Sequence, residues 1–224
     1  MITLEKPYSV RKSGIENEGI SFGIKKDGLA HIFNVLRNQL YSNKILAVIR
    51  EYSCNAYDAM VEAGTSDQKF VVTCPTFDDP CFKVRDFGSG LSPEGIAEVY
   101  AYYGESTKRQ SNAFIGQLGL GSKSGFAYGD NFVIKSFYRG TLYTYNAYLD
   151  ETKIGQILLM DEEATSENDG VEIVIPVKVR DISTFKETIA SFFKHFKSKP
   201  IINNIEKVYL EVYWKDEGQI LNGQ

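Results

Sequence analysis

The chain has few of the residues that build disulfide frameworks or metal centres. Its 224 residues include only three cysteines, Cys54, Cys74 and Cys81, without Cys-x-x-Cys spacing, and two histidines far apart in sequence, His31 and His195. A disulfide-stapled fold needs paired cysteines, and a zinc site needs clustered Cys and His ligands. The composition therefore argues against both classes and predicts reduced thiols in a cytoplasm.

The sequence also lacks a strong positive charge and a long hydrophobic run. Its formal net charge is −4 at pH 7, whereas binding along a nucleic-acid backbone needs clustered Lys and Arg. The basic stretch 192–199 has its aromatic residues at the spacing of a helix core, so it gives no strong nucleic-acid signal. No segment reaches the roughly 18 apolar residues of a membrane span. We expect a cytoplasmic protein without a transmembrane segment, for which any membrane association is peripheral.

Core-forming residues, in contrast, are plentiful. Hydrophobic residues make up 43% of the chain, with 14 Phe, 14 Tyr and one Trp, and charged residues make up 24%. A chain of this length can bury about 70% of its unfolded surface in one large domain. We expect that domain at 1–200, followed at 201–224 by a C-terminal strand and the start of a following domain, so that the sequence is a fragment of a longer protein.

A helical run at 45–60 places three polar side chains together. Glu51, Asn55 and Asp58 stand at i, i+4 and i+7, within roughly 60° of one another on a helix. The carboxylate suits proton transfer from water, and an amide oxygen suits Mg²⁺, which keeps its other positions for waters and phosphate. Alone, this pattern is also that of an ordinary solvated helix face. The apolar stripe of the same run is Ile45, Ile49, Tyr52, Ala56, Ala59 and Ala63.

A first glycine-rich segment follows a predicted strand at 81–85. That strand runs into Asp86, Gly88 and Gly90, where missing side chains let backbone come close to a flat ligand. Asp86 can accept a hydrogen bond from an exocyclic amine such as that of adenine. In isolation, an ordinary turn has the same pattern.

A second glycine-rich segment contains Gly116, Gly119 and Gly121, ahead of a helix predicted to begin near Ser122. Successive backbone N–H groups in such a loop form a site for polyphosphate. Lys123 comes one position too late for a P-loop, and neither glycine cluster fits the Gly-x-Gly-x-x-Gly dinucleotide fingerprint.

Taken in order, these three motifs resemble the N, G1 and G2 boxes of the GHKL ATPase superfamily. That superfamily includes gyrase B, heat-shock chaperones of the ninety-kilodalton class, sensor histidine kinases and MutL. The stretch 103–108 is similar to the lid of the chaperone branch, and 169–175 to the G3 box, with Val171 where the family usually has Thr. Within the superfamily, the amino-acid sequence at 50–59 and 103–109 is most similar to that of the N-terminal domain of bacteriophage rIIA-like proteins.

The resemblance implies the α+β Bergerat fold, an α/β sandwich with a mixed, mainly antiparallel sheet and helices on one face. We expect a hairpin turn at Arg139 and Gly140, and a helix capped by Asp181 that turns Phe185, Ile189, Phe192 and Phe196 inward. The other expected helices are 30–41, 45–60 and 93–103. The expected strands are 20–24, 69–74, 81–85, 131–138, 141–149, 156–161, 171–177 and 207–214.

The resemblance also implies roles for individual residues. Glu51 is the expected general base and Asn55 the expected Mg²⁺ ligand. Asp86 is expected to bind the adenine of ATP, with Asp58 supporting that side through water. The other expected nucleotide contacts are Gly88 and Gly90 in the base-pocket wall, Gly170 in the G3 box, and Lys108, Gly116, Gln117, Leu118, Gly119, Leu120, Gly121 and Ser122 at the phosphates.

The expected function is slow hydrolysis of Mg·ATP that acts as a lid and dimerisation switch, with ATP ordering 104–121 and promoting a homodimer. The rIIA resemblance adds an rIIB-like partner and a role in host lysis or exclusion, in the host cytoplasm. A nucleotide-binding scaffold without turnover and a chaperone-like GHKL ATPase stay open. A histidine kinase is disfavoured, because neither His31 nor His195 lies in a convincing phosphoacceptor helix.

Overall fold

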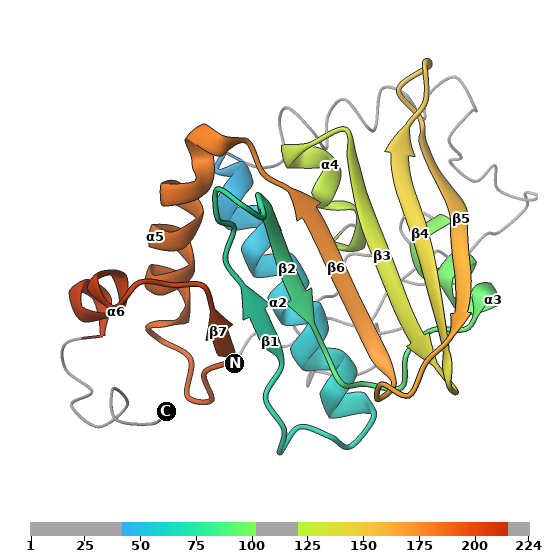
Figure 1. Cartoon of the computed structure of the whole chain (residues 1–224), viewed down its shortest axis with the longest axis horizontal. Coiled ribbons are helices and arrows are strands. Elements are labelled where there is room, and N and C mark those ends of the chain that lie inside the picture. The colour runs from blue at the N-terminus through green and yellow to red at the C-terminus, as the bar shows by residue number, and fades with distance from the viewer. Residues whose placement is uncertain (1–41, 102–120, 215–224) are drawn as a thin grey trace, which may run out of the picture.

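A seven-stranded sheet forms the centre of the computed structural model, which describes residues 42–101 and 121–214 (Figure 1). The strand order is β5-β4-β3-β6-β2-β1-β7. Only β1 and β7 run parallel, and every other neighbouring pair of these strands is antiparallel. The expected α+β architecture with a mixed, mainly antiparallel sheet is confirmed. The strands are β1 (Val71–Thr73), β2 (Cys81–Arg85), β3 (Asn131–Tyr138), β4 (Thr141–Leu149), β5 (Gly155–Ala164), β6 (Gly170–Pro176) and β7 (Ile201–Asn203).

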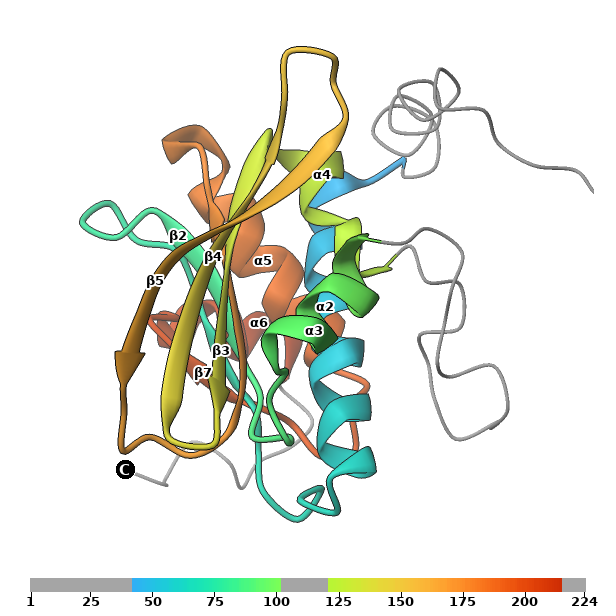
Figure 2. The same cartoon turned by 90° about the vertical axis from the view of Figure 1, so that its right-hand side faces the viewer.

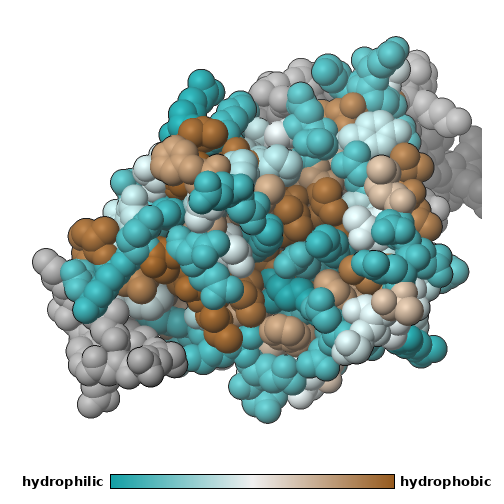
Figure 3. Space-filling model, viewed as in Figure 1, coloured by the Kyte–Doolittle hydropathy of each residue, from teal (hydrophilic) through white to brown (hydrophobic). Residues whose placement is uncertain are grey.

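Helices gather on one face of this sheet. Figure 2 shows α2, α4 and α5 on the same side of the strands, and Figure 3 shows hydrophobic and hydrophilic side chains mixed over the opposite face. Among the described residues, no helix combines the length and apolar character needed to cross a bilayer. The helices are α2 (Lys44–Glu62), α3 (Pro93–Ile96), α4 (Gly125–Tyr128), α5 (Ile182–Phe193) and α6 (Lys207–Tyr213), with a π turn η1 (Ala97–Ala101) and 3₁₀ turns η2 (Gly121–Lys123) and η3 (Val179–Asp181).

Helix α2 confirms the helix expected at 45–60. It begins after Asn43, whose side chain accepts a hydrogen bond from the backbone N–H of Leu46 at 3.0 Å. Such an N-cap stabilises a helix by about 1 kcal/mol. Ile49, Tyr52 and Ala56 of the expected apolar stripe are all buried. The stripe therefore fixes which side of α2 faces the sheet. It also fixes the direction in which the polar side chains of the same helix point.

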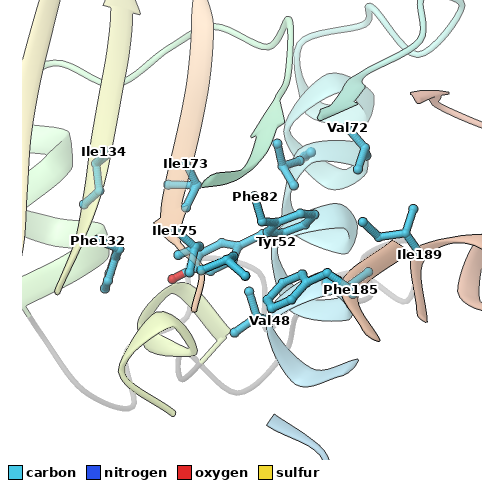
Figure 4. Packing of buried hydrophobic residues seen from close by; sticks show 14 of the residues in the cluster. Val48, Tyr52, Val72, Phe82, Phe132, Ile134, Ile173, Ile175, Phe185 and Ile189 are labelled. Atoms are coloured by element: carbon cyan, nitrogen blue, oxygen red, sulfur yellow. The ribbon is translucent and has the colours of Figure 1, made fainter. Parts of the chain in front are cut away.

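The hydrophobic core lies between the sheet and the pair α2 and α5 (Figure 4). Phe82 of β2 and Phe185 of α5 are fully buried, with ring centroids 5.5 Å apart. Burial of each such side chain contributes about 1.5–3 kcal/mol. Helix α2 packs on this layer through its own buried residues, Ile49 and Tyr52 among them. Its partners in Figure 4 include Val72, Phe132, Ile134, Ile173, Ile175 and Ile189.

The hairpin between β3 and β4 turns where expected. Arg139 and Gly140 have φ values of 51° and 79°, and Tyr138 pairs with Thr141 across the turn. Positive φ at both central residues is the type I′ geometry, whose twist matches that of the flanking strands. The glycine is needed here because it adopts this conformation without steric cost.

The strand expected at 207–214 is wrong, because this segment forms the helix α6. Its β-branched and aromatic residues favour a strand, but Val208 and Val212 are exposed, whereas Tyr209, Leu210, Tyr213 and Trp214 are partly buried on one side. The Trp214 indole N–H donates to the carbonyl oxygen of Ala190 at 2.8 Å, which docks α6 onto α5. The last described strand is instead β7, which pairs with β1.

Three helix boundaries also differ from expectation. The helix at 93–103 begins as predicted, with Ser92 Oγ accepting from Gly95 N at 3.1 Å, but α-helical bonding ends at Ile96 and a π turn follows. The helix expected near Ser122 begins at Gly125, after the 3₁₀ turn η2. Phe196 lies beyond the last residue of α5. The strand expected at 20–24, the helix expected at 30–41 and the stretch 103–108 that is similar to a lid lie outside the described residues.

Asp181 precedes α5 but does not cap it with its side chain. Its Oδ2 accepts a hydrogen bond from the Tyr128 hydroxyl at 2.7 Å instead. The Tyr128 oxygen in turn accepts from the backbone N–H of Lys178 at 3.1 Å. Asp181 therefore stands at the expected N-cap position, but its side chain makes no capping hydrogen bond, because a tyrosine of α4 takes the carboxylate.

Candidate functional site

Glu51 and Asn55 lie one turn apart on α2 and face the start of η2. A Cβ placed on Gly121 would lie 2.6 Å from Glu51 Oε2 and 3.7 Å from Asn55 Nδ2. The first distance is shorter than real Cβ contacts, so the carboxylate occupies the space that any larger residue at 121 would need. The structure thus brings together the expected base, the expected Mg²⁺ ligand and the last glycine of the expected phosphate loop.

One oxygen of Glu51 is held by its neighbour in sequence. Arg50 Nη2 donates to Glu51 Oε1 at 2.6 Å, and the side chain of Glu51 is 18% exposed. A surface ion pair of this kind adds only about 0–1 kcal/mol to stability. Its effect at the site is directional, because it leaves Oε2 as the oxygen turned toward Gly121.

Tyr52 fastens the end of the glycine loop to α2. Its hydroxyl accepts from the backbone N–H of Gly125 at 2.9 Å and donates to the carbonyl oxygen of Ser122 at 3.1 Å. A Cβ on Gly125 would lie 2.9 Å from the same hydroxyl, so only glycine leaves room for this contact. Since Tyr52 directly follows Glu51, one bridge sets the distance between the expected base and the loop. Sequence reasoning placed Tyr52 on the apolar stripe and missed the role of its hydroxyl.

Lys123 lies beside the glycine loop with 5% of its surface exposed. Its Nζ donates to the carbonyl oxygen of Val99 at 3.1 Å and to Ser122 Oγ at 3.2 Å. Ser122 Oγ also donates to the carbonyl oxygen of Val99, at 3.3 Å. These contacts join η1 to η2, so the segment before the expected lid and the segment after the expected phosphate loop are held together at their ends.

Burial lowers the pKa of Lys123 from 10.5 to about 8. The unfolded chain therefore binds more protons than the folded chain between these values, and the folded state gains stability as pH rises from about 8 to 10.5. Lys123→Met removes the titrating group, so the free energy of unfolding of this variant should rise less between pH 7 and pH 10 than that of wild type. Denaturant unfolding at pH 7 and pH 10 tests this.

The matched control for that prediction is Lys197→Met, which removes an exposed lysine and should change stability by less than about 0.5 kcal/mol. Lys197→Met should keep the pH dependence of wild type. A Lys123→Met variant whose stability rises with pH as much as that of wild type would contradict the prediction.

Asp86 follows the end of β2 and is 6% exposed. Its Oδ1 accepts from the backbone N–H groups of Gly88 at 2.9 Å and Val171 at 3.1 Å. Its own backbone N–H donates to the carbonyl oxygen of Val171 at 2.9 Å. The carboxylate is therefore oriented by the G1 turn and by β6 at once, as recognition of a flat base requires. Its contact with adenine stays a prediction.

The glycines around Asp86 are needed for packing of the protein backbone itself. A Cβ on Gly88 would lie 3.0 Å from the carbonyl oxygen of Ala59, and one on Gly90 or Gly170 would collide with the carbonyl of Phe137 or Asp86, respectively. Gly90 and Gly170 also have φ values of +66° and +139°. The G1 turn thus lies against α2, next to the fully buried Asp58. That burial suits an indirect role for Asp58.

The remaining expected phosphate contacts are not among the described residues, namely Lys108, Gly116, Gln117, Leu118, Gly119 and Leu120. In the part of the chain that the structure describes, no three His, Cys, Asp or Glu side chains form a cluster that could hold a metal ion. Asn55 offers a side-chain amide, and Mg²⁺ accepts one or two protein oxygens beside those of phosphate and water. The residues present fit Mg·ATP on that basis.

No protein-family model matches the chain. Among curated proteins, it is 26% identical over 210 residues to the chaperone protein HtpG of Rickettsia typhi and to that of Rickettsia prowazekii, with 83% of this chain and 32% of each relative covered. HtpG of Rickettsia akari is also 26% identical, over 211 residues. The chain spans about a third of the length of the curated relatives it matches. Together with the order of its motifs, this distant similarity to HtpG supports a place for the chain in the GHKL superfamily.

Proposed function

We propose that this domain binds Mg·ATP and hydrolyses it slowly. The observation that carries the proposal is the meeting of Glu51 and Asn55 with Gly121, because a carboxylate that can accept a proton, a side-chain amide and the last glycine of the expected phosphate loop lie together there. Asp86 stands at a second position, fixed by two backbone N–H groups. A polyphosphate at the first position and a base at the second account for both sets of residues.

Each group then has a distinct task. Glu51 accepts a proton from the attacking water through Oε2, while Arg50 holds Oε1. A bound Mg²⁺, held by Asn55, would neutralise charge on the phosphates. Backbone N–H groups of 116–122 and Lys108 would bind the phosphates, and Asp86 would accept a hydrogen bond from the adenine amine. Asp58, Gly88, Gly90 and Gly170 support the base side.

The curated relatives favour a chaperone-type role, because all three of those named above are chaperones. The role expected from the rIIA resemblance, in a phage protein with an rIIB-like partner, rests only on the amino-acid sequence of 50–59 and 103–109. The curated relatives do not support it. We further propose that ATP closes 104–121 as a lid and promotes a weak homodimer.

Isothermal titration with ATP, a non-hydrolysable analogue and GTP, each with and without Mg²⁺, tests the proposal together with a phosphate-release assay. We expect Mg²⁺-dependent binding of ATP and the analogue, weaker binding of GTP, and slow release of phosphate. Binding without release would indicate a nucleotide-binding scaffold instead. If millimolar ATP and its analogue gave no heat of binding, with or without Mg²⁺, that result would contradict the proposal.

A further inference from the structure

Arg85 joins the two segments that surround the Asp86 carboxylate. It is the last residue of β2, directly before Asp86, and is 7% exposed. Its Nη1 donates to the carbonyl oxygen of Asp86, and its Nη2 donates to the carbonyl oxygen of Asn168 at 2.5 Å. The first acceptor begins the G1 turn, and the second lies in the loop before β6. One guanidinium therefore connects the G1 turn to the start of the G3 segment.

The guanidinium has little freedom to take another orientation. Its central carbon lies 3.9 Å from the ring centroid of Phe137 and 4.9 Å from that of Phe87. The negative face of each ring attracts the cation in this geometry. A Cβ on Gly170 would collide with Nη1, so the missing side chain at 170 makes room for the guanidinium. Two rings and one glycine thus hold the planar donor group in place.

The charge of Arg85 is also balanced locally. Burial lowers the pKa of Arg85, and the carboxylates of Asp86, Glu167, Glu172 and Asp169 oppose that shift. A guanidinium stays protonated in proteins and presents several N–H donors in one plane. A lysine at this position would offer a point charge without the fork that reaches two carbonyl groups.

The two segments joined by Arg85 also supply the donors that orient Asp86. Gly88 N belongs to the G1 turn and Val171 N to β6, and both donate to Asp86 Oδ1. We propose that Arg85 is a positioning residue for nucleobase selection, which keeps these two donors in register and so aims the Asp86 carboxylate at an exocyclic amine. This inference rests on the proposed function, and it assigns base selectivity to a residue that does not itself contact the base.

Comparison of ATP with inosine triphosphate tests the assignment, because the latter has a carbonyl oxygen where adenine has its amine. Wild type should bind ATP at least about tenfold more tightly, the least expected of a hydrogen bond to a charged group. Arg85→Met and Arg85→Lys should lose most of that discrimination and keep their affinity for inosine triphosphate. The exposed Arg180→Met is the matched control and should discriminate like wild type.

A purely structural role for Arg85 would weaken binding of both nucleotides equally, and that result would overturn the assignment. So would full discrimination in both Arg85 variants. Arg85→Lys keeps the charge and provides the test if Arg85→Met does not fold. A double variant that combines Arg85→Met with Asp86→Asn should discriminate between ATP and inosine triphosphate no less than Asp86→Asn alone. Wild type that binds neither nucleotide would instead refute the proposed function itself.

Discussion

Glu51→Ala should reduce the rate of ATP hydrolysis by about 10²–10⁴-fold, the usual contribution of a positioned acid–base group, while nucleotide affinity stays close to wild type. The reason is that the Glu51 carboxylate faces the glycine loop through Oε2 and is held through Oε1. Single-turnover phosphate release separates the chemical step from binding, and titration of the same variant measures affinity.

Two substitutions on the same helix complete this experiment. Glu62→Ala removes an exposed carboxylate near the end of α2 and should hydrolyse ATP like wild type. Asn55→Ala should show a different defect, because it should bind nucleotide without responding to Mg²⁺. Undiminished hydrolysis by Glu51→Ala would mean that the activity belongs to another site or another protein.

Asp86→Asn should weaken ATP binding by about 1.5–3 kcal/mol, the contribution of a hydrogen bond to a charged group. Asparagine keeps the shape and one carbonyl oxygen, which can still accept from the N–H groups of Gly88 and Val171. It removes the negative charge and places an amide N–H where the second carboxylate oxygen stood. Isothermal titration measures the loss, and thermal unfolding shows that the variant is folded.

The matched control is Asp161→Asn, which changes an exposed carboxylate on β5 and should bind ATP like wild type. GTP presents a carbonyl oxygen to Asp86 in place of an amine, so wild type should bind it more weakly than ATP. Equal affinity of wild type for ATP and GTP would refute the assignment of Asp86 to the base.

The sequence predicted an element correctly where the intrinsic secondary-structure preference of the segment agreed with its tertiary contacts. Strands β3 and β4 are rich in β-branched and aromatic residues and flank a glycine turn, and both were predicted to the residue. The helix around Glu51 has an N-cap and an apolar stripe. The segment 207–214 lacks this agreement, since its β-branched and aromatic residues favour a strand, whereas it forms a helix that Trp214 docks on α5. Tertiary contacts decided that element.

The same distinction separates the site residues that sequence revealed from those it did not. Glu51 and Asn55 are one helical turn apart, so their proximity follows from spacing alone. Gly121 could be tied to them only through a family resemblance, and the structure shows that it lies against both. Tyr52 and Arg85 were missed, because a hydroxyl on an apolar stripe and a guanidinium at a strand end have no partner until distant backbone reaches them.

A crystal structure of this chain with a non-hydrolysable ATP analogue and Mg²⁺ tests the central claim most directly. The account predicts the adenine amine against the Asp86 carboxylate, the phosphates beside Gly121, the cation on the Asn55 oxygen, and Glu51 Oε2 facing the terminal phosphate. An analogue bound elsewhere, or bound here with its base away from Asp86 and its cation away from Asn55, would contradict it.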